Sequence, residues 1–109
     1  MRVIEPMVLL LLAQEPSHGY RLVERLEEAF GVVDLPAQTV YRVLQHLEEA
    51  EWITSTWDTE SAQGPPRKVY EITTEGLEAL DMWSQEIQEL QETLDSLLGA
   101  YRRFKQSPS

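Results

Sequence analysis

The sequence predicts a mainly α-helical protein with a small β-hairpin, arranged as a winged helix-turn-helix followed by a long C-terminal dimerisation helix. Three observations predict this class. Apolar residues recur at helical spacing through the first half of the chain, two short strand-like runs follow, and an unbroken helical pattern fills the last third. We therefore expect a DNA-binding domain at 1–73 and a dimerisation helix with its tail at 74–109.

Length and composition narrow the class of protein. The chain has 109 residues, which suits one domain, and it has no cysteine, which excludes disulfides and thiolate metal sites. The apolar run Met7–Ala13 is much shorter than the roughly 20 residues that a membrane span needs. No signal-peptide pattern precedes it. We expect a cytoplasmic protein without a membrane partner.

Enzymatic chemistry is not indicated. The two histidines, His18 and His46, lack the spacing of a metal-binding helix, and no nucleotide-binding or nucleophile motif is present. The sequence therefore predicts no catalytic residue, no metal site and no cofactor.

The first two helices are expected at Val3–Gln14 and His18–Phe30. The leucine-rich centre of the first leaves no polar side, so we expect it to be buried nearly all round, in part against a second subunit. Ser17 is the expected N-cap of the second helix. On that helix, Tyr20 belongs to the expected apolar side and Arg25 to the polar side.

The central helix, expected at Pro36–Trp52, carries the clearest functional pattern. Four apolar side chains mark its buried face: Val40, Val43, Leu44 and Leu47. The other face is polar, and no acid occurs from Leu35 to Leu47. Such a face suits a DNA major groove, whereas the alternative interpretation is an ordinary amphipathic core helix. The candidates for base contacts are Gln38, Thr39, Arg42 and Gln45, with Tyr41 as a candidate for backbone contact.

A β-hairpin is expected from two strand-like runs, Trp52–Thr59 and Val69–Thr73. A long, flexible tip at 60–68 would join them. A hairpin that follows a helix-turn-helix is a wing. Arg67 and Lys68, expected on its tip, are candidates for phosphate contacts, although they could also be ordinary solubilising residues.

The last helix is expected from Thr74 to about Lys105. Its apolar residues alternate at intervals of three and four, which is the heptad pattern of a coiled coil. A helix this long cannot bury that seam on a small domain, so the simplest partner is a second copy. Trp83 lies in the seam, where it could also stack on a flat aromatic ligand. The expected interface comprises Leu80, Trp83, Ile87, Leu90, Leu94, Leu97 and Tyr101, and the pattern continues to Phe104.

Charge is segregated along the chain. The formal net charge is −10, which argues against nonspecific nucleic-acid affinity. Eight acids and no Lys or Arg lie between Val69 and Ala100, whereas most basic residues of the first 70 lie in or near the segments expected to face DNA. A local positive surface can therefore coexist with an acidic body.

Several short motifs, taken together, resemble the PadR family of bacterial transcriptional regulators. They are Pro-Ser-His-Gly-Tyr at 16–20, Thr-Val-Tyr at 39–41, the wing at 64–70 and Ile-Thr-Thr-Glu-Gly at 72–76. The resemblance covers nearly the whole chain. It implies a winged helix-turn-helix whose C-terminal helix drives homodimerisation, acting typically as a repressor released by a ligand or another signal.

These observations lead to one hypothesis and two alternatives. The hypothesis is a homodimeric repressor that binds double-stranded DNA at an inverted repeat, with half-sites about one helical turn, roughly 34 Å, apart. Release by a small aromatic effector is left open, as is a regulator that needs no small ligand. The alternative from another class is an acidic, dimeric winged-helix module that binds proteins and not DNA.

Overall fold

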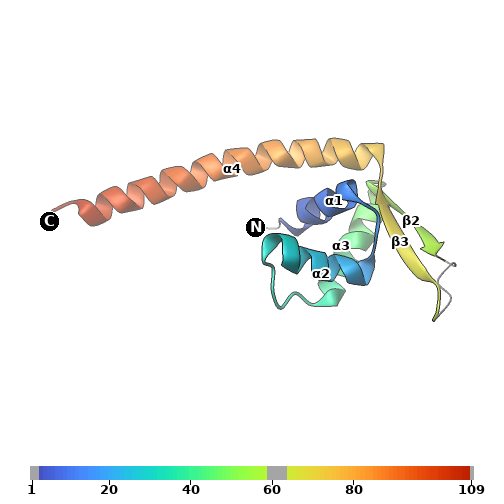
Figure 1. Ribbon diagram of the computed structural model, residues 1–109. Helices are drawn as coiled ribbons and strands as arrows, with labels where there is room; N and C mark the ends of the chain where they lie inside the picture. The colour runs from blue at the N-terminus through green and yellow to red at the C-terminus, as the bar shows by residue number, and fades with distance from the viewer. Residues whose placement is uncertain (1–2, 59–63, 109) are drawn as a thin grey trace.

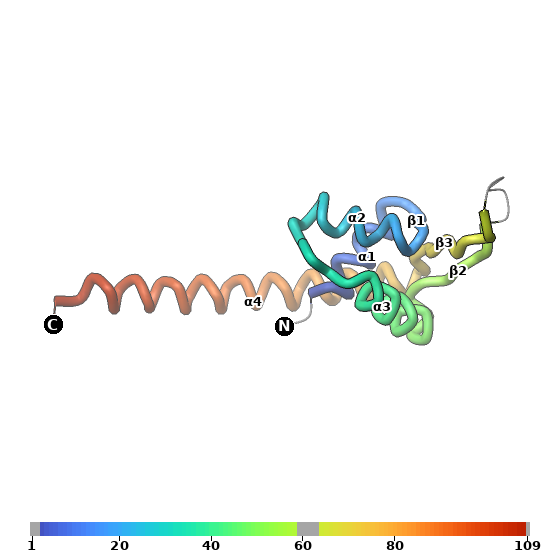
Figure 2. Tube along the Cα trace, turned by 90° about the horizontal axis from the view of Figure 1, so that it is seen from below, coloured from blue at the N-terminus to red at the C-terminus, as the bar shows by residue number. Residues whose placement is uncertain are grey.

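A computed structural model describes residues 3–58 and 64–108 of the chain (Figure 1). Helices and strands follow one another in the order α1 (Ile4–Gln14), β1 (Ser17–His18), α2 (Gly19–Phe30), α3 (Ala37–Glu49), β2 (Ile53–Asp58), β3 (Arg67–Ile72) and α4 (Thr74–Gln106). The first three helices and the sheet form a globular part, and α4 leaves it in the direction opposite to the hairpin (Figure 2). The predicted fold class is confirmed.

The centre of the core is α1, which contacts α2, α3, β3 and α4. Its side chains Val8, Leu9, Leu11 and Leu12 are almost fully buried among apolar residues from every other helix. Burial all round was predicted, but Leu10 remains 39% exposed. This side of α1 lines an open groove with the end of α2 and the start of α4.

Ser17 is not the N-cap of α2, contrary to the prediction. Ser17 and His18 form β1, which pairs antiparallel with β3 through Ser17–Tyr70 and His18–Val69. The N-cap is therefore His18, and its side chain makes no capping hydrogen bond. Because the edge of β3 offers main-chain partners, the residues before α2 adopt extended backbone and add a third strand that the sequence pattern did not reveal.

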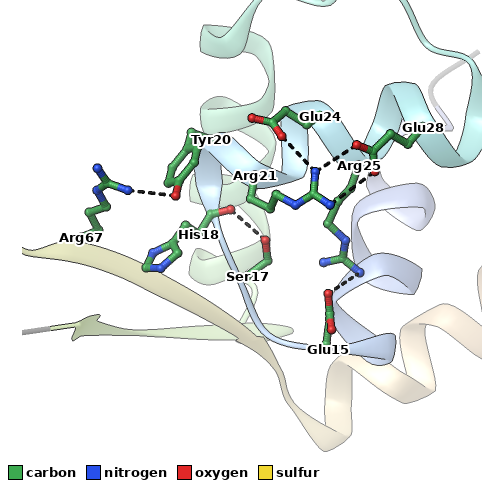
Figure 3. A network of polar contacts seen from close by, with 9 residues as sticks. All are labelled: Glu15, Ser17, His18, Tyr20, Arg21, Glu24, Arg25, Glu28 and Arg67. Carbon is green, nitrogen blue, oxygen red and sulfur yellow. Dashed lines mark hydrogen bonds and ion pairs between the residues drawn. The ribbon is translucent and has the colours of Figure 1, made fainter. Parts of the chain in front are cut away.

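Arg25 is buried, although helical periodicity placed it on the polar side of α2. It is 7% exposed, and its Nη2 donates a hydrogen bond of 2.8 Å to the carbonyl oxygen of Leu11. Figure 3 shows Arg25 between α2 and the end of α1. The Leu11 carbonyl oxygen, in the last turn of α1, also accepts the backbone N–H of Glu15 at 3.2 Å. Arg25 thus supplies a tertiary partner for the C-terminal end of α1. By contrast, Arg21 lies at the surface, where its hydrogen bond to Glu28 raises its pKa.

The central helix, expected at Pro36–Trp52, ends earlier than predicted. α3 stops at Glu49, and Glu51 takes a left-handed backbone conformation with φ of 63°. The N–H of Trp52 then bonds the carbonyl of Leu47 at 3.0 Å. This turn redirects the chain into β2, so the prediction of helix as far as Trp52 was wrong over its last three residues.

The predicted hairpin is confirmed and belongs to a three-stranded antiparallel sheet with the order β1-β3-β2. Residues 59–63, which include the first four residues of the predicted flexible tip, lie outside the described part. Arg67 and Lys68 are in β3 and not on the tip, because they extend the ladder opposite Asp58 and Trp57.

The long helix α4 begins at the N-cap Thr73, whose hydroxyl accepts a hydrogen bond of 3.0 Å from the N–H of Gly76. Its first turns belong to the globular part, since Gly76 and Ala79 are buried and Leu80 and Trp83 pack on the core. Beyond Trp83, most apolar side chains of α4 are exposed. Among the described residues, no helix has the length and apolar character required to cross a membrane.

Candidate nucleic-acid interface

The side chains of α3 lie in stripes along the helix, set by its 100° rotation per residue. One stripe is the core contact, where Val40, Leu44 and Leu47 are fully buried. The stripe opposite the core is exposed and consists of Gln38, Arg42 and Gln45. The structure therefore brings three of the four predicted base-contact residues onto the outermost line of the helix.

Thr39, the fourth base-contact candidate, is half-buried and turns toward α4. It lines a cleft of about 570 Å³ between α1, α3 and α4. This cleft, which we call the Trp83 cleft, is lined by Ile4, Glu5, Thr39, Arg42, Val43, His46 and Trp83. At its rim, His46 Nδ1 lies 2.6 Å from a carboxylate oxygen of Glu5, which ties α3 to α1. Arg42 belongs both to this cleft and to the outer stripe.

Tyr41 lies on the side of α3 that faces the hairpin. Its ring sits against Gly19, where an added Cβ would come within 2.6 Å of Tyr41 Cε1. A larger residue at position 19 would therefore displace the ring from this place. The glycine of the His-Gly-Tyr segment thus sets where Tyr41 lies, a role that no periodicity signal indicated.

A second cleft, of about 320 Å³, separates α3 from the hairpin, and we call it the wing cleft. It contains three predicted backbone-contact residues: Tyr41, Arg67 and Lys68. It also contains residues that the sequence analysis did not select, namely His18, Gly19, Tyr20, Trp57, Pro66 and Tyr70. None of these described lining residues is acidic, in a chain with 19 acids.

Both cations of the wing cleft lie over aromatic rings. Arg67 donates a hydrogen bond of 2.8 Å from Nη1 to the hydroxyl of Tyr20, and its guanidinium lies 4.9 Å from the ring centroid (Figure 3). Lys68 Nζ lies 5.6 Å from the ring of Trp57. Such contacts are weak at exposed sites. They orient the two cations without neutralising their charge.

The floor of the wing cleft is held by polar and aromatic contacts. The ring of His18 stacks on Tyr20 with centroids 5.7 Å apart, and its Nε2 lies 3.7 Å from Asp58. Behind them Tyr70 is nearly buried. Burial, followed by the charges of Glu48 and Tyr41, raises the pKa of Tyr70.

A third surface lies away from α3 and is apolar. It is a groove of about 570 Å³ between α1, the end of α2 and the start of α4. Leu10, Phe30, Leu80 and Ile87 are among its lining residues. The predicted seam divides at this point, because Trp83 turns into the Trp83 cleft while Leu80 and Ile87 line the groove.

Comparison with known proteins gives consistent results. The sequence profile of the "Transcriptional regulator PadR-like family" matches residues 8–82. A PadR-like regulator from Bacillus cereus is 30% identical, with a TM-score of 0.75 over 88% of this chain and 91% of that one. A putative transcriptional regulator from Thermoplasma acidophilum is 30% identical, with a TM-score of 0.79 over 89% and 91%. A PadR family regulator from Eggerthella lenta is 34% identical, with a TM-score of 0.70 over 84% and 80%. No match was found among proteins with curated descriptions.

Proposed function

This chain belongs to the PadR-like family of transcriptional regulators, and from that premise we propose that it is a repressor that binds an inverted-repeat operator as a homodimer. One observation carries the proposal. Tyr41 of α3, next to the outward residue Arg42, lines the wing cleft together with the cations Arg67 and Lys68, and acids are absent from the described lining of that cleft. A duplex can therefore meet both elements at once despite the net charge of −10.

Dimerisation is supported by the apolar surface that the subunit leaves in water. α4 has 33 residues, or about 50 Å of helix, and only its first turns pack on the globular part. Leu94, Leu97 and Tyr101 are exposed in its distal half, while the groove beside Leu10 and Phe30 lies open on the domain. We propose that the distal half of one α4 covers the partner's α4 and this groove.

Arg42 and the wing cations are expected to contribute differently to DNA binding. Arg42→Ala should weaken binding to a selected operator by about ten- to hundredfold, with a smaller effect on random duplex, because it removes a base contact. Arg67→Ala/Lys68→Ala should weaken binding to both duplexes and lower the salt slope by about 1.8, or roughly 0.9 per phosphate contact. Fluorescence anisotropy at several salt concentrations measures both effects.

The control is Lys105→Ala, which removes a cation in the last turn of α4, far from α3 and the hairpin. It should leave both affinities unchanged. An unchanged salt slope in Arg67→Ala/Lys68→Ala would contradict the wing assignment. Failure of the wild-type protein to enrich any sequence from a random duplex library would favour the alternative, an acidic winged-helix module that binds proteins.

Release by a small aromatic ligand is supported by the Trp83 cleft. Its volume of about 570 Å³ falls in the range of small-molecule sites, and it combines an indole and aliphatic side chains with a few polar groups. Arg42 and Thr39 belong to its wall, so an occupant would compete directly with DNA for α3. We propose this cleft, rather than the dimer seam, as the place where an aromatic effector meets Trp83.

Titration with planar aromatic amines and carboxylates is expected to quench Trp83 saturably. The decrease in emission should correspond to one of the three tryptophans, and no such decrease should occur in Trp83→Phe. Trp57→Phe is the matched control, because that indole lies in the other cleft. Emission that stays constant throughout the titration would favour a regulator without a small ligand.

A further inference from the structure

Trp57 is a largely exposed aromatic side chain that lines the wing cleft together with Tyr41 of α3. Along β2, residues Ile53, Ser55 and Trp57 share one face of the sheet, because side chains alternate between faces. Their partners across the ladder are Ile72, Tyr70 and Lys68. This is the face that packs on the core, since Ile53 and Tyr70 are buried. Trp57 continues the inward-facing row past the edge of the core, and it is 62% exposed.

The position of Trp57 relates it to the path of DNA. A recognition helix in a major groove and a wing in the adjoining minor groove have one sugar–phosphate strand between them. On this protein, the space between those two elements is the wing cleft. Tyr41 of α3 lies on one side of it, and Trp57 and Lys68 of the hairpin lie on the other.

We propose that the wing cleft grips the DNA strand between the two grooves, and that Trp57 packs its indole on a deoxyribose of that strand. Lys68, held over the same ring, then lies beside the adjacent phosphate. A deoxyribose offers an apolar surface without sequence information, so the indole adds affinity on any sequence and Lys68 adds the charge-dependent part. This inference rests on the proposed DNA-binding function and assigns a contact to a residue outside the predicted set.

The expected result is a loss of affinity without a change in salt dependence. Trp57→Ala should bind about tenfold more weakly than the wild type, both to the duplex that the wild-type protein selects and to a duplex of scrambled sequence. Its salt slope should equal that of the wild type, because no phosphate contact is lost. Trp57→Phe should stay within about threefold of the wild type. Hydroxyl-radical footprinting, which reports on deoxyribose, should show weaker protection of the strand between the grooves in Trp57→Ala.

Two variants serve as references. Thr56→Ala changes an exposed residue on the opposite face of the same strand and should leave affinity and footprint unchanged. Lys68→Ala should lower the salt slope by about 0.9 while keeping the sugar protection. Thermal unfolding of Trp57→Ala should match the wild type, because the indole is mostly in water.

Three outcomes would overturn the proposal. Unchanged affinity and footprint in Trp57→Ala, with Arg42→Ala still defective, would remove the indole contact and leave the proposed function standing. A salt slope in Trp57→Ala as low as that of Lys68→Ala would mean that the indole acts only by orienting the lysine. Absence of DNA binding by the wild type would remove both the contact and the proposed function.

Discussion

Leu94→Glu/Leu97→Glu is expected to give a folded monomer whose operator affinity is roughly 10²–10⁴-fold below that of the wild type. Both leucines are exposed on the part of α4 that extends from the globular domain, and Leu97 is 64% exposed. If a partner helix covers them, carboxylates at these positions cannot be buried without a large penalty. Each half-site would then be bound singly, which removes the gain from two linked contacts.

Sedimentation equilibrium and fluorescence anisotropy measure the two parts of this prediction. Gln85→Glu/Ser96→Glu is the matched control, because it adds the same charges on the side of α4 opposite the seam. It should remain dimeric and bind normally. A Leu94→Glu/Leu97→Glu protein that is still dimeric at micromolar concentration would show that the distal seam is not the interface. A monomeric variant with wild-type affinity would show that the operator does not require two copies.

Gly76→Ala is expected to destabilise the fold by about 3 kcal/mol, within the range for overpacking of a tight site. An added Cβ would overlap the carbonyl oxygen of Trp52 and lie 2.7 Å from Ile72 Cγ1. The Trp52 carbonyl also accepts the N–H of Thr73 at 2.9 Å, so it cannot move away without breaking that bond. This contact holds the start of α4 against the residue that precedes β2. Urea unfolding followed by circular dichroism measures the decrease in the free energy of unfolding.

Gly99→Ala provides the opposite control within the same helix. An added Cβ there meets only the flexible end of Arg103, at 3.4 Å. Alanine in place of glycine inside a helix should therefore stabilise the protein by about 0.5–1 kcal/mol. If Gly76→Ala unfolds at the same urea concentration as the wild type, the close approach of α4 to Trp52 is not a constraint on the fold.

Tertiary contacts explain where the sequence-based interpretation of single residues was wrong. Helical periodicity places Arg25 among polar side chains, but its hydrogen bond to the carbonyl oxygen of Leu11 in α1 holds it inside. Local preference makes Ser17 a capping residue, but the open edge of β3 takes it into the sheet. Both outcomes depend on groups far apart along the chain, which no local pattern contains.

Composition and hydrophobic periodicity were sufficient for the fold class, for the helices and hairpin, and for the length of α4, because each of these follows from spacing along the chain. They also selected Gln38, Arg42 and Gln45, which share the outward line of one helix. The wing cleft needed the tertiary structure, because it forms only where Gly19 admits Tyr41 and where β3 carries Arg67 and Lys68 back toward α2. The same holds for the Trp83 cleft, since α4 brings its indole to α3 from a distant part of the sequence.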